Sequence, residues 1–107
     1  MKKNAKMRTL DEQVRRMAAE FNSMEGTTGN RIVTSSVSDD LEYDYRFGFV
    51  TERELTGMQV DTMKSILLSQ GFVAADTQFT FGGHVLWIYA VHVGVDTADD
   101  ARLAKSA

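Results

Sequence analysis

Two stretches of the chain place apolar residues three and four positions apart, which is the period of a helix that buries one side. The first stripe comprises Leu10, Val14, Met17, Ala18, Phe21 and Met24, and the second comprises Val60, Met63, Ile66 and Leu67. Thr9 with Glu12, and Thr56 with Gln59, have the spacing of a capping box, which marks the start of a helix. The pattern predicts helices over 10–25 and 57–70.

Four other stretches have the pattern of strands. Residues 41–50 alternate between apolar and polar side chains, and residues 32–37 are rich in β-branched side chains. Residues 72–81 end in Phe79-Thr80-Phe81, and Gly82-Gly83 then predicts a tight hairpin. Residues 84–93 are apolar at nearly every position, so we expect this strand to lie inside a sheet.

The order α-β-β-α-β-β predicts an α+β fold, a two-layer sandwich of one four-stranded antiparallel sheet with both helices on one face. We expect residues 41–50 to lie beside residues 84–93, with 31–37 and 72–81 outermost. Residues 9–95 would form this single domain. A flexible basic lead-in would precede it at 1–8, and a short helix or flexible tail would follow at 96–107.

Composition narrows the class of protein. The chain has 107 residues, a net charge of −3 and no cysteine. This length fits one domain, and the acidic balance excludes a generally basic, histone-like protein. Without cysteine there is no disulfide, thiolate nucleophile or cysteine-ligated zinc. No apolar stretch follows the first lysines, which predicts that there is no signal peptide and that the protein is cytoplasmic.

One short string resembles part of a known family. Arg46-Phe47-Gly48-Phe49-Val50-Thr51 resembles a fragment of the third-strand signature of the RNA-recognition motif. The resemblance implies that Phe47 and Phe49 stack on bases and that Arg46 contacts a phosphate. The string departs from the signature, because no glycine separates Arg46 from Phe47 and Glu52 replaces the closing aromatic residue.

The charges beside this aromatic row favour a different orientation. If Phe47 and Phe49 faced solvent, the alternating residues Glu42, Asp44 and Arg46 would face the helices. Burying unpaired charges costs several kcal/mol each. We therefore expect the aromatic row to face the core.

The strand at 84–93 predicts a binding surface, because it is apolar on both faces. We expect the face that carries His84, Leu86, Ile88, Ala90 and His92 to lie on the side of the sheet that the helices leave uncovered. Glu42, Asp44 and Arg46 would form one rim, and Asp76, Gln78 and Thr80 the other. An apolar strip with a polar rim is typical of a protein–protein contact, unless residues 97–107 fold over it.

Other candidate chemistry is sparse. His84 and His92 lie eight residues apart on one strand, about 26 Å at strand rise, which is too far to share one metal ion. The neighbouring carboxylates Glu42 and Asp44 would serve acid–base catalysis only where burial separates their pKa values. Arg15 and Arg16, on the basic face of the first helix, could attract nucleic acid or an acidic partner.

The sequence thus predicts a small non-enzymatic protein-binding module without a cofactor. It would act stoichiometrically, as a regulator or inhibitor of the kind that phages or other mobile elements encode. It would dock another protein, or a second copy as a homodimer, through the free face around Leu86 and Ile88. A nucleic-acid-binding domain that uses Phe47 and Phe49, or Arg15 and Arg16, is one alternative, and a small enzyme of unknown class is the other.

Overall fold

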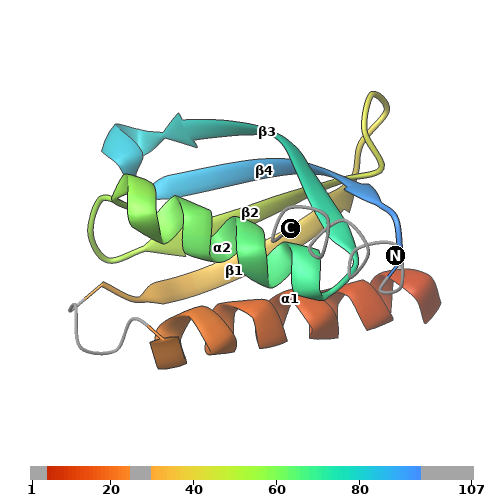
Figure 1. The fold of residues 1–107 in the computed structure, drawn as a ribbon, viewed down its shortest axis with the longest axis horizontal. Helices are drawn as coiled ribbons and strands as arrows, with labels where there is room; N and C mark the ends of the chain where they lie inside the picture. Colours follow the sequence, from red (N-terminus) through yellow and green to blue (C-terminus); the bar gives the residue numbers. More distant parts are fainter. Residues whose placement is uncertain (1–4, 25–29, 95–107) are drawn as a thin grey trace, which may run out of the picture.

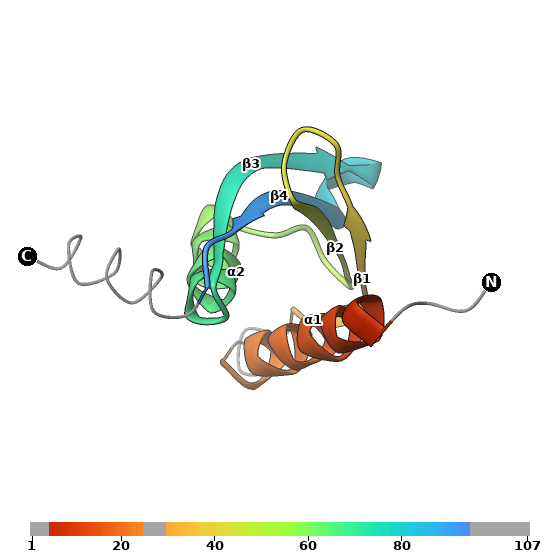
Figure 2. The same cartoon turned by 90° about the vertical axis from the view of Figure 1, so that its right-hand side faces the viewer.

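The computed structural model describes residues 5–24 and 30–94. The elements are α1 (Ala5–Met24), β1 (Ile32–Asp39), β2 (Tyr45–Thr51), α2 (Gly57–Ser69), β3 (Phe72–Thr80), the short 3₁₀ helix η1 (Phe81–Gly83) and β4 (Val85–His92). The strands form one antiparallel sheet in the order β1-β2-β4-β3 (Figure 1). The predicted α+β class and strand order are therefore confirmed. Figure 2 shows that both helices pack under one face of the twisted sheet.

The start of α1 differs from the prediction. The helix already includes Ala5, so Thr9 lies within it and the predicted capping box at Thr9 is wrong. Alanine, lysine and methionine, which occupy positions 5–7, all favour helix, and this extends α1 toward the N-terminus. Residues 1–4 of the predicted lead-in and the predicted tail at 96–107 lie outside the described residues.

The start of α2 agrees with the prediction. The N–H of Gln59 donates to Thr56 Oγ1 over 3.2 Å, and the N–H of Thr56 donates to Gln59 Oε1 over 3.0 Å. This capping box satisfies two groups that the first helical turn leaves unpaired. At the β3–β4 hairpin, Gly82 and Gly83 both have positive φ, as predicted. The turn is longer than predicted, because β3 ends at Thr80 and Phe81, which also has positive φ, begins η1.

The core lies between the helices and one face of the sheet. Its largest fully buried side chains are Phe21, Phe47, Phe49, Phe72, Met17, Met63, Leu67, Leu86, Ile88 and Val14. Phe47 and Phe72 pack edge to face, with ring centroids 5.0 Å apart. The prediction that Phe47 and Phe49 face the core is thus confirmed, and so are the helical stripes except at Met24, which is exposed.

The strand predicted at 41–50 begins only at Tyr45. Residues 41–44 form a loop instead, because the carboxylate of Asp40 accepts the N–H groups of Glu42 and Tyr43 over 3.0 and 2.8 Å. These local bonds compete with strand pairing and turn the chain. Glu42 therefore does not share a strand face with Asp44, contrary to the prediction.

The predicted orientation of β4 is wrong. Phe47 pairs with Ile88, and Phe49 pairs with Leu86. Directly opposed residues of antiparallel strands point to the same side of a sheet. Because the phenylalanines face the helices, Leu86 and Ile88 do so too, and both are fully buried. They cannot form the free binding face, whose strand β4 residues are instead the odd-numbered Val85, Trp87, Tyr89 and Val91.

Replacing Leu86 with alanine is expected to lower the free energy of unfolding by about 2–5 kcal/mol, because the change leaves a cavity in a closed core. Urea denaturation measures this loss. Leu41→Ala is the matched control, since Leu41 is fully exposed in the loop and its loss should change stability by no more than about 0.5 kcal/mol. Equal stability of the two variants would contradict the burial of Leu86.

Candidate functional site

The uncovered side of the sheet is the candidate site, and we call it the open face. The register places on it the side chains that alternate with the buried rows: Thr34, Ser36 and Ser38 of β1, Arg46, Gly48 and Val50 of β2, Val85, Trp87, Tyr89 and Val91 of β4, and Val73, Asp76, Gln78 and Thr80 of β3. Apart from Val73, the outer strands thus contribute only polar side chains to this set. The aromatic residues lie on the central strand β4.

Trp87 lies flat across the middle of the open face. It pairs with Gly48 in the register, and a Cβ atom at Gly48 would lie only 2.6 Å from Trp87 Cζ3 and 2.8 Å from Ser36 Oγ. Only glycine leaves room for the indole there. At the other side, the indole Nε1 donates to Thr80 Oγ1 on β3 over 3.1 Å. The ring is therefore fixed between neighbouring strands while remaining partly exposed.

Arg46 covers part of this indole. Its Cζ atom lies 4.6 Å from the centre of the Trp87 ring, which is a cation–π contact. The Nε atom of Arg46 is shielded from solvent and has no hydrogen-bond acceptor among the described residues. Tyr89, which pairs with Arg46 in the register, continues the same aromatic surface along β4. These three side chains form the centre of the open face.

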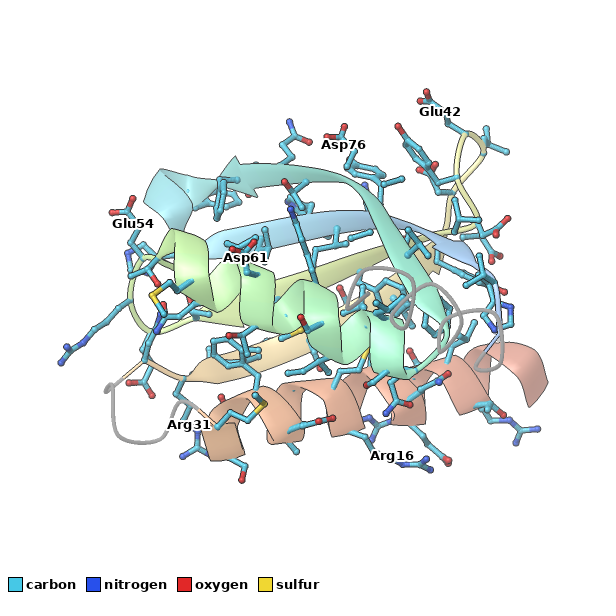
Figure 3. The ribbon with its side chains drawn as sticks, in the orientation of Figure 1. Arg16, Arg31, Glu42, Glu54, Asp61 and Asp76 are labelled. Carbon is cyan, nitrogen blue, oxygen red and sulfur yellow. The ribbon has the colours of Figure 1, made fainter. Side chains whose placement is uncertain are left out.

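A shallow hollow of about 470 Å³ adjoins one end of the open face. We call it the acidic hollow, and its lining residues are Glu42, Tyr43, Asp76, Thr77, Gln78 and Tyr89. The rings of Tyr43 and Tyr89 have centroids 5.7 Å apart and are tilted by 48°. Figure 3 shows Glu42 and Asp76 at the same edge of the molecule, on the side away from the helices. The hollow thus combines two aromatic rings with two carboxylates.

The carboxylates give the acidic hollow a negative potential. Glu42 raises the pKa of the Tyr43 phenol above its ordinary value by charge repulsion of the phenolate, and burial, Asp76 and Asp40 add to the increase. Among the residues that the structure describes, no lysine or arginine lines the hollow to neutralise these charges.

The structure separates the other residues predicted for the site. His84 lies at the end of the sheet, where its Nδ1 is 3.3 Å from the carbonyl oxygen of Thr51. His92 packs its ring against Phe72, with centroids 4.9 Å apart. The backbone N–H of His92 donates to Asp44 Oδ2 over 2.8 Å, so Asp44 fixes the end of β4. Of the predicted partner-binding set, Arg46 lies at the centre of the open face and Glu42 lies in the acidic hollow.

Sequence reasoning missed Trp87 and Tyr89 as site residues. Both belong to the odd-numbered side chains of β4, which the sequence analysis placed on the side of the helices. The signal that could have placed them was the aromatic row of β2, because neighbouring strands must bury the same side of their sheet.

The structure excludes the aromatic part of the nucleic-acid alternative and leaves its basic part a prediction. Phe47 and Phe49 are fully buried, so base stacking on them, as the resemblance to the RNA-recognition motif implied, is ruled out. Arg15 and Arg16 are exposed on α1, but Arg15 Nε donates to the carbonyl oxygen of Asp11, and Arg16 lies 3.7 Å from the Glu12 carboxylate. Acidic residues therefore lie beside both arginines on the helix surface.

Residues 5–24 and 30–94 contain no group of three or more histidine, aspartate or glutamate side chains that could hold a metal ion. In the same part of the chain, neither helix is long and apolar enough to span a membrane. Comparison of the chain with protein-family models, with curated proteins and with solved structures finds no match. The geometry of the open face is therefore the basis for a functional proposal.

Gly48→Ala is expected to displace the Trp87 indole, because the new methyl group would overlap Cζ3 of the ring. The displacement should shift the emission of Trp87, which is the single tryptophan of the chain, and reduce stability by about 1–3 kcal/mol. Fluorescence and urea denaturation measure the two effects. Gly57→Ala is the matched control, because nothing lies within 4 Å of a Cβ there. An unchanged Trp87 spectrum in Gly48→Ala would contradict the close packing.

Tyr43 is expected to ionise at a higher pH than an ordinary tyrosine, and Glu42→Gln should lower its pKa, since Glu42 is the largest cause of the increase. The folded protein holds this proton more tightly than the unfolded chain, so ionisation of Tyr43 opposes folding at alkaline pH. NMR titration of the tyrosine rings measures the change. The same pKa in wild type and Glu42→Gln would show that the carboxylate does not act on the ring.

Proposed function

We propose that the protein is a stoichiometric protein-binding module that docks a partner protein on its open face. The observation that supports this most directly is the cluster of Trp87, Arg46 and Tyr89 at the centre of that face. Tryptophan, tyrosine and arginine are the residues that most often dominate the energy of protein interfaces, and they do so near the interface centre. Here all three are partly exposed, and the Trp87 indole is held by its hydrogen bond to Thr80.

The surroundings of the cluster support the same function. Val91 of β4 and Val73 of β3 are partly exposed and extend the aromatic surface, whereas Val85 is buried. The other side chains that the edge strands place on this face carry hydroxyl, amide or carboxylate groups. This arrangement of an apolar centre and a polar rim is the usual anatomy of a binding surface. The indole and Arg46 are already ordered, so docking would cost little side-chain entropy.

Charge favours a protein partner over nucleic acid. Glu42 and Asp76 line the hollow at one end of the open face. Among the described side chains that the register places on the open face, Arg46 is the only basic one. Phosphate contacts need several lysines or arginines, and carboxylates repel the backbone of nucleic acid. A role as a regulator or inhibitor is consistent with such a module. A phage or mobile-element origin, a cytoplasmic location and the absence of enzymatic activity stay predictions.

The test uses Trp87 both as a probe and as a target. A partner captured from an extract of the source organism is purified and titrated against the wild-type chain while Trp87 emission is recorded. Docking on the open face should shift the emission to shorter wavelength as the indole loses water. Trp87→Ala should weaken binding about 30-fold or more, and Tyr89→Ala should weaken it about tenfold, in separate calorimetric titrations.

Met58→Ala is the control, because Met58 is exposed at the start of α2 and lies outside the open face. It should bind as the wild type does. The proposal would be overturned if the partner bound the wild-type chain without changing Trp87 emission, and bound Trp87→Ala and Tyr89→Ala with unchanged affinity. Light scattering distinguishes a homodimer from a complex with a different protein. If the mass of the wild-type chain is doubled and that of Trp87→Ala is not, a second copy of the chain occupies the open face.

A further inference from the structure

The acidic hollow adjoins the open face and indicates which chemical group the partner would place there. Its walls come from three places in the chain, namely the loop before β2, strand β3 and strand β4. Tyr89 belongs both to the hollow and to the open face, so the two surfaces are continuous. A partner that covers Trp87 would therefore extend over the hollow as well.

The two carboxylates of the hollow are available to a ligand. Asp76 Oδ1 accepts the N–H of Thr77 over 2.9 Å, and its Oδ2 has no hydrogen-bond donor among the described residues. The side chain of Glu42 has no hydrogen bond or ion pair within the same part of the chain. In Figure 3 both point away from the core. Their charge is left for something outside the protein to balance.

The aromatic walls add a second preference for a cation. Tyr43 and Tyr89 present tilted rings to the same space, and the faces of aromatic rings attract cations. A guanidinium group fits both features, since it stacks on aromatic rings and donates two parallel hydrogen bonds to a carboxylate. A metal ion would fit less well, because two carboxylates supply too few of the six to eight oxygen ligands that calcium takes.

We propose that the acidic hollow receives an arginine side chain of the partner that docks on the open face. This inference rests on the proposed function and adds the chemistry of the partner. The docking segment carries an arginine at the hollow and apolar residues that cover Trp87. The carboxylates then favour one direction of the segment across the sheet, because the open-face side chains at the other end, Thr34, Val50, Thr80 and Val85, carry no charge. Glu54 lies beyond these side chains, against Gly83 of the β3–β4 turn.

The experiment titrates the ¹⁵N-labelled full chain with a capped tripeptide that has arginine between two leucines. The control ligand replaces arginine with citrulline, which keeps the shape and removes the charge. At constant ionic strength, the arginine peptide should shift the amide signals of Tyr43, Asp76 and Tyr89 to saturation. The citrulline peptide should bind at least about fivefold more weakly, because a charged hydrogen bond is lost.

Variants then test the lining of the hollow. Glu42→Gln and Asp76→Asn should each weaken binding of the arginine peptide about threefold. Asp61→Asn is the matched control, since Asp61 is an exposed carboxylate on α2, on the helical side of the molecule (Figure 3). It should leave the affinity unchanged. Equal binding of the citrulline peptide, equal loss in Asp61→Asn, or equal binding of a lysine peptide would overturn the assignment of arginine.

The two proposals fail separately. If the arginine peptide does not bind the hollow while Trp87→Ala still abolishes docking of the whole partner, only the arginine inference is overturned. If the peptide binds the hollow while Trp87→Ala and Tyr89→Ala leave partner docking intact, the hollow is an arginine site and the proposed function of the open face is overturned.

Discussion

The register between β2 and β4 is the constraint on which the rest of the structure depends. It places Phe47 opposite Ile88 and Phe49 opposite Leu86, so that four large apolar side chains meet the helices together. The same register turns Trp87 and Tyr89 to the opposite side. A shift of one residue would exchange the two sets, because side chains alternate along a strand. Trp87 would then enter the core in place of Leu86, and the open face would lose its aromatic centre.

Gly48 makes an uncovered aromatic residue tolerable on this face. Because position 48 has no side chain, the Trp87 indole can lie along the sheet, and Thr80 accepts its N–H. Arg46 then covers part of the ring with its guanidinium group. A tryptophan that stood upright would expose most of its surface, as an aggregation-prone patch does. The flat indole exposes less, and its fixed position also favours specific recognition.

Local signals in the sequence were sufficient for the elements and their order, but not for the side of β4 that faces the core. The Thr56 capping box and the Phe47 and Phe49 row depend on residues close in sequence, and the structure contains both as predicted. The orientation of β4 depends on pairing with a strand that is distant in sequence. Apolar residues occupy both the odd-numbered and the even-numbered positions of β4, so the sequence pattern alone does not show which face is buried. The loop at 41–44 was missed for another reason, because side-chain bonds from Asp40 outweigh an alternating pattern that looks like strand.

Among the described residues, the charges of the open face do not pair with one another. Arg46 pairs with Tyr89, and Tyr89 pairs with Asp76, so the aromatic ring lies between the cation and the nearest carboxylate in one row across the sheet. No ion pair joins Arg46 to a described carboxylate. A partner that placed a positive group at Arg46 and a negative group at Asp76 would be repelled at both positions. Such repulsion contributes more to specificity than to affinity. In the proposed docking, the apolar centre would therefore set the strength of binding, while the row Arg46–Tyr89–Asp76 would set its direction.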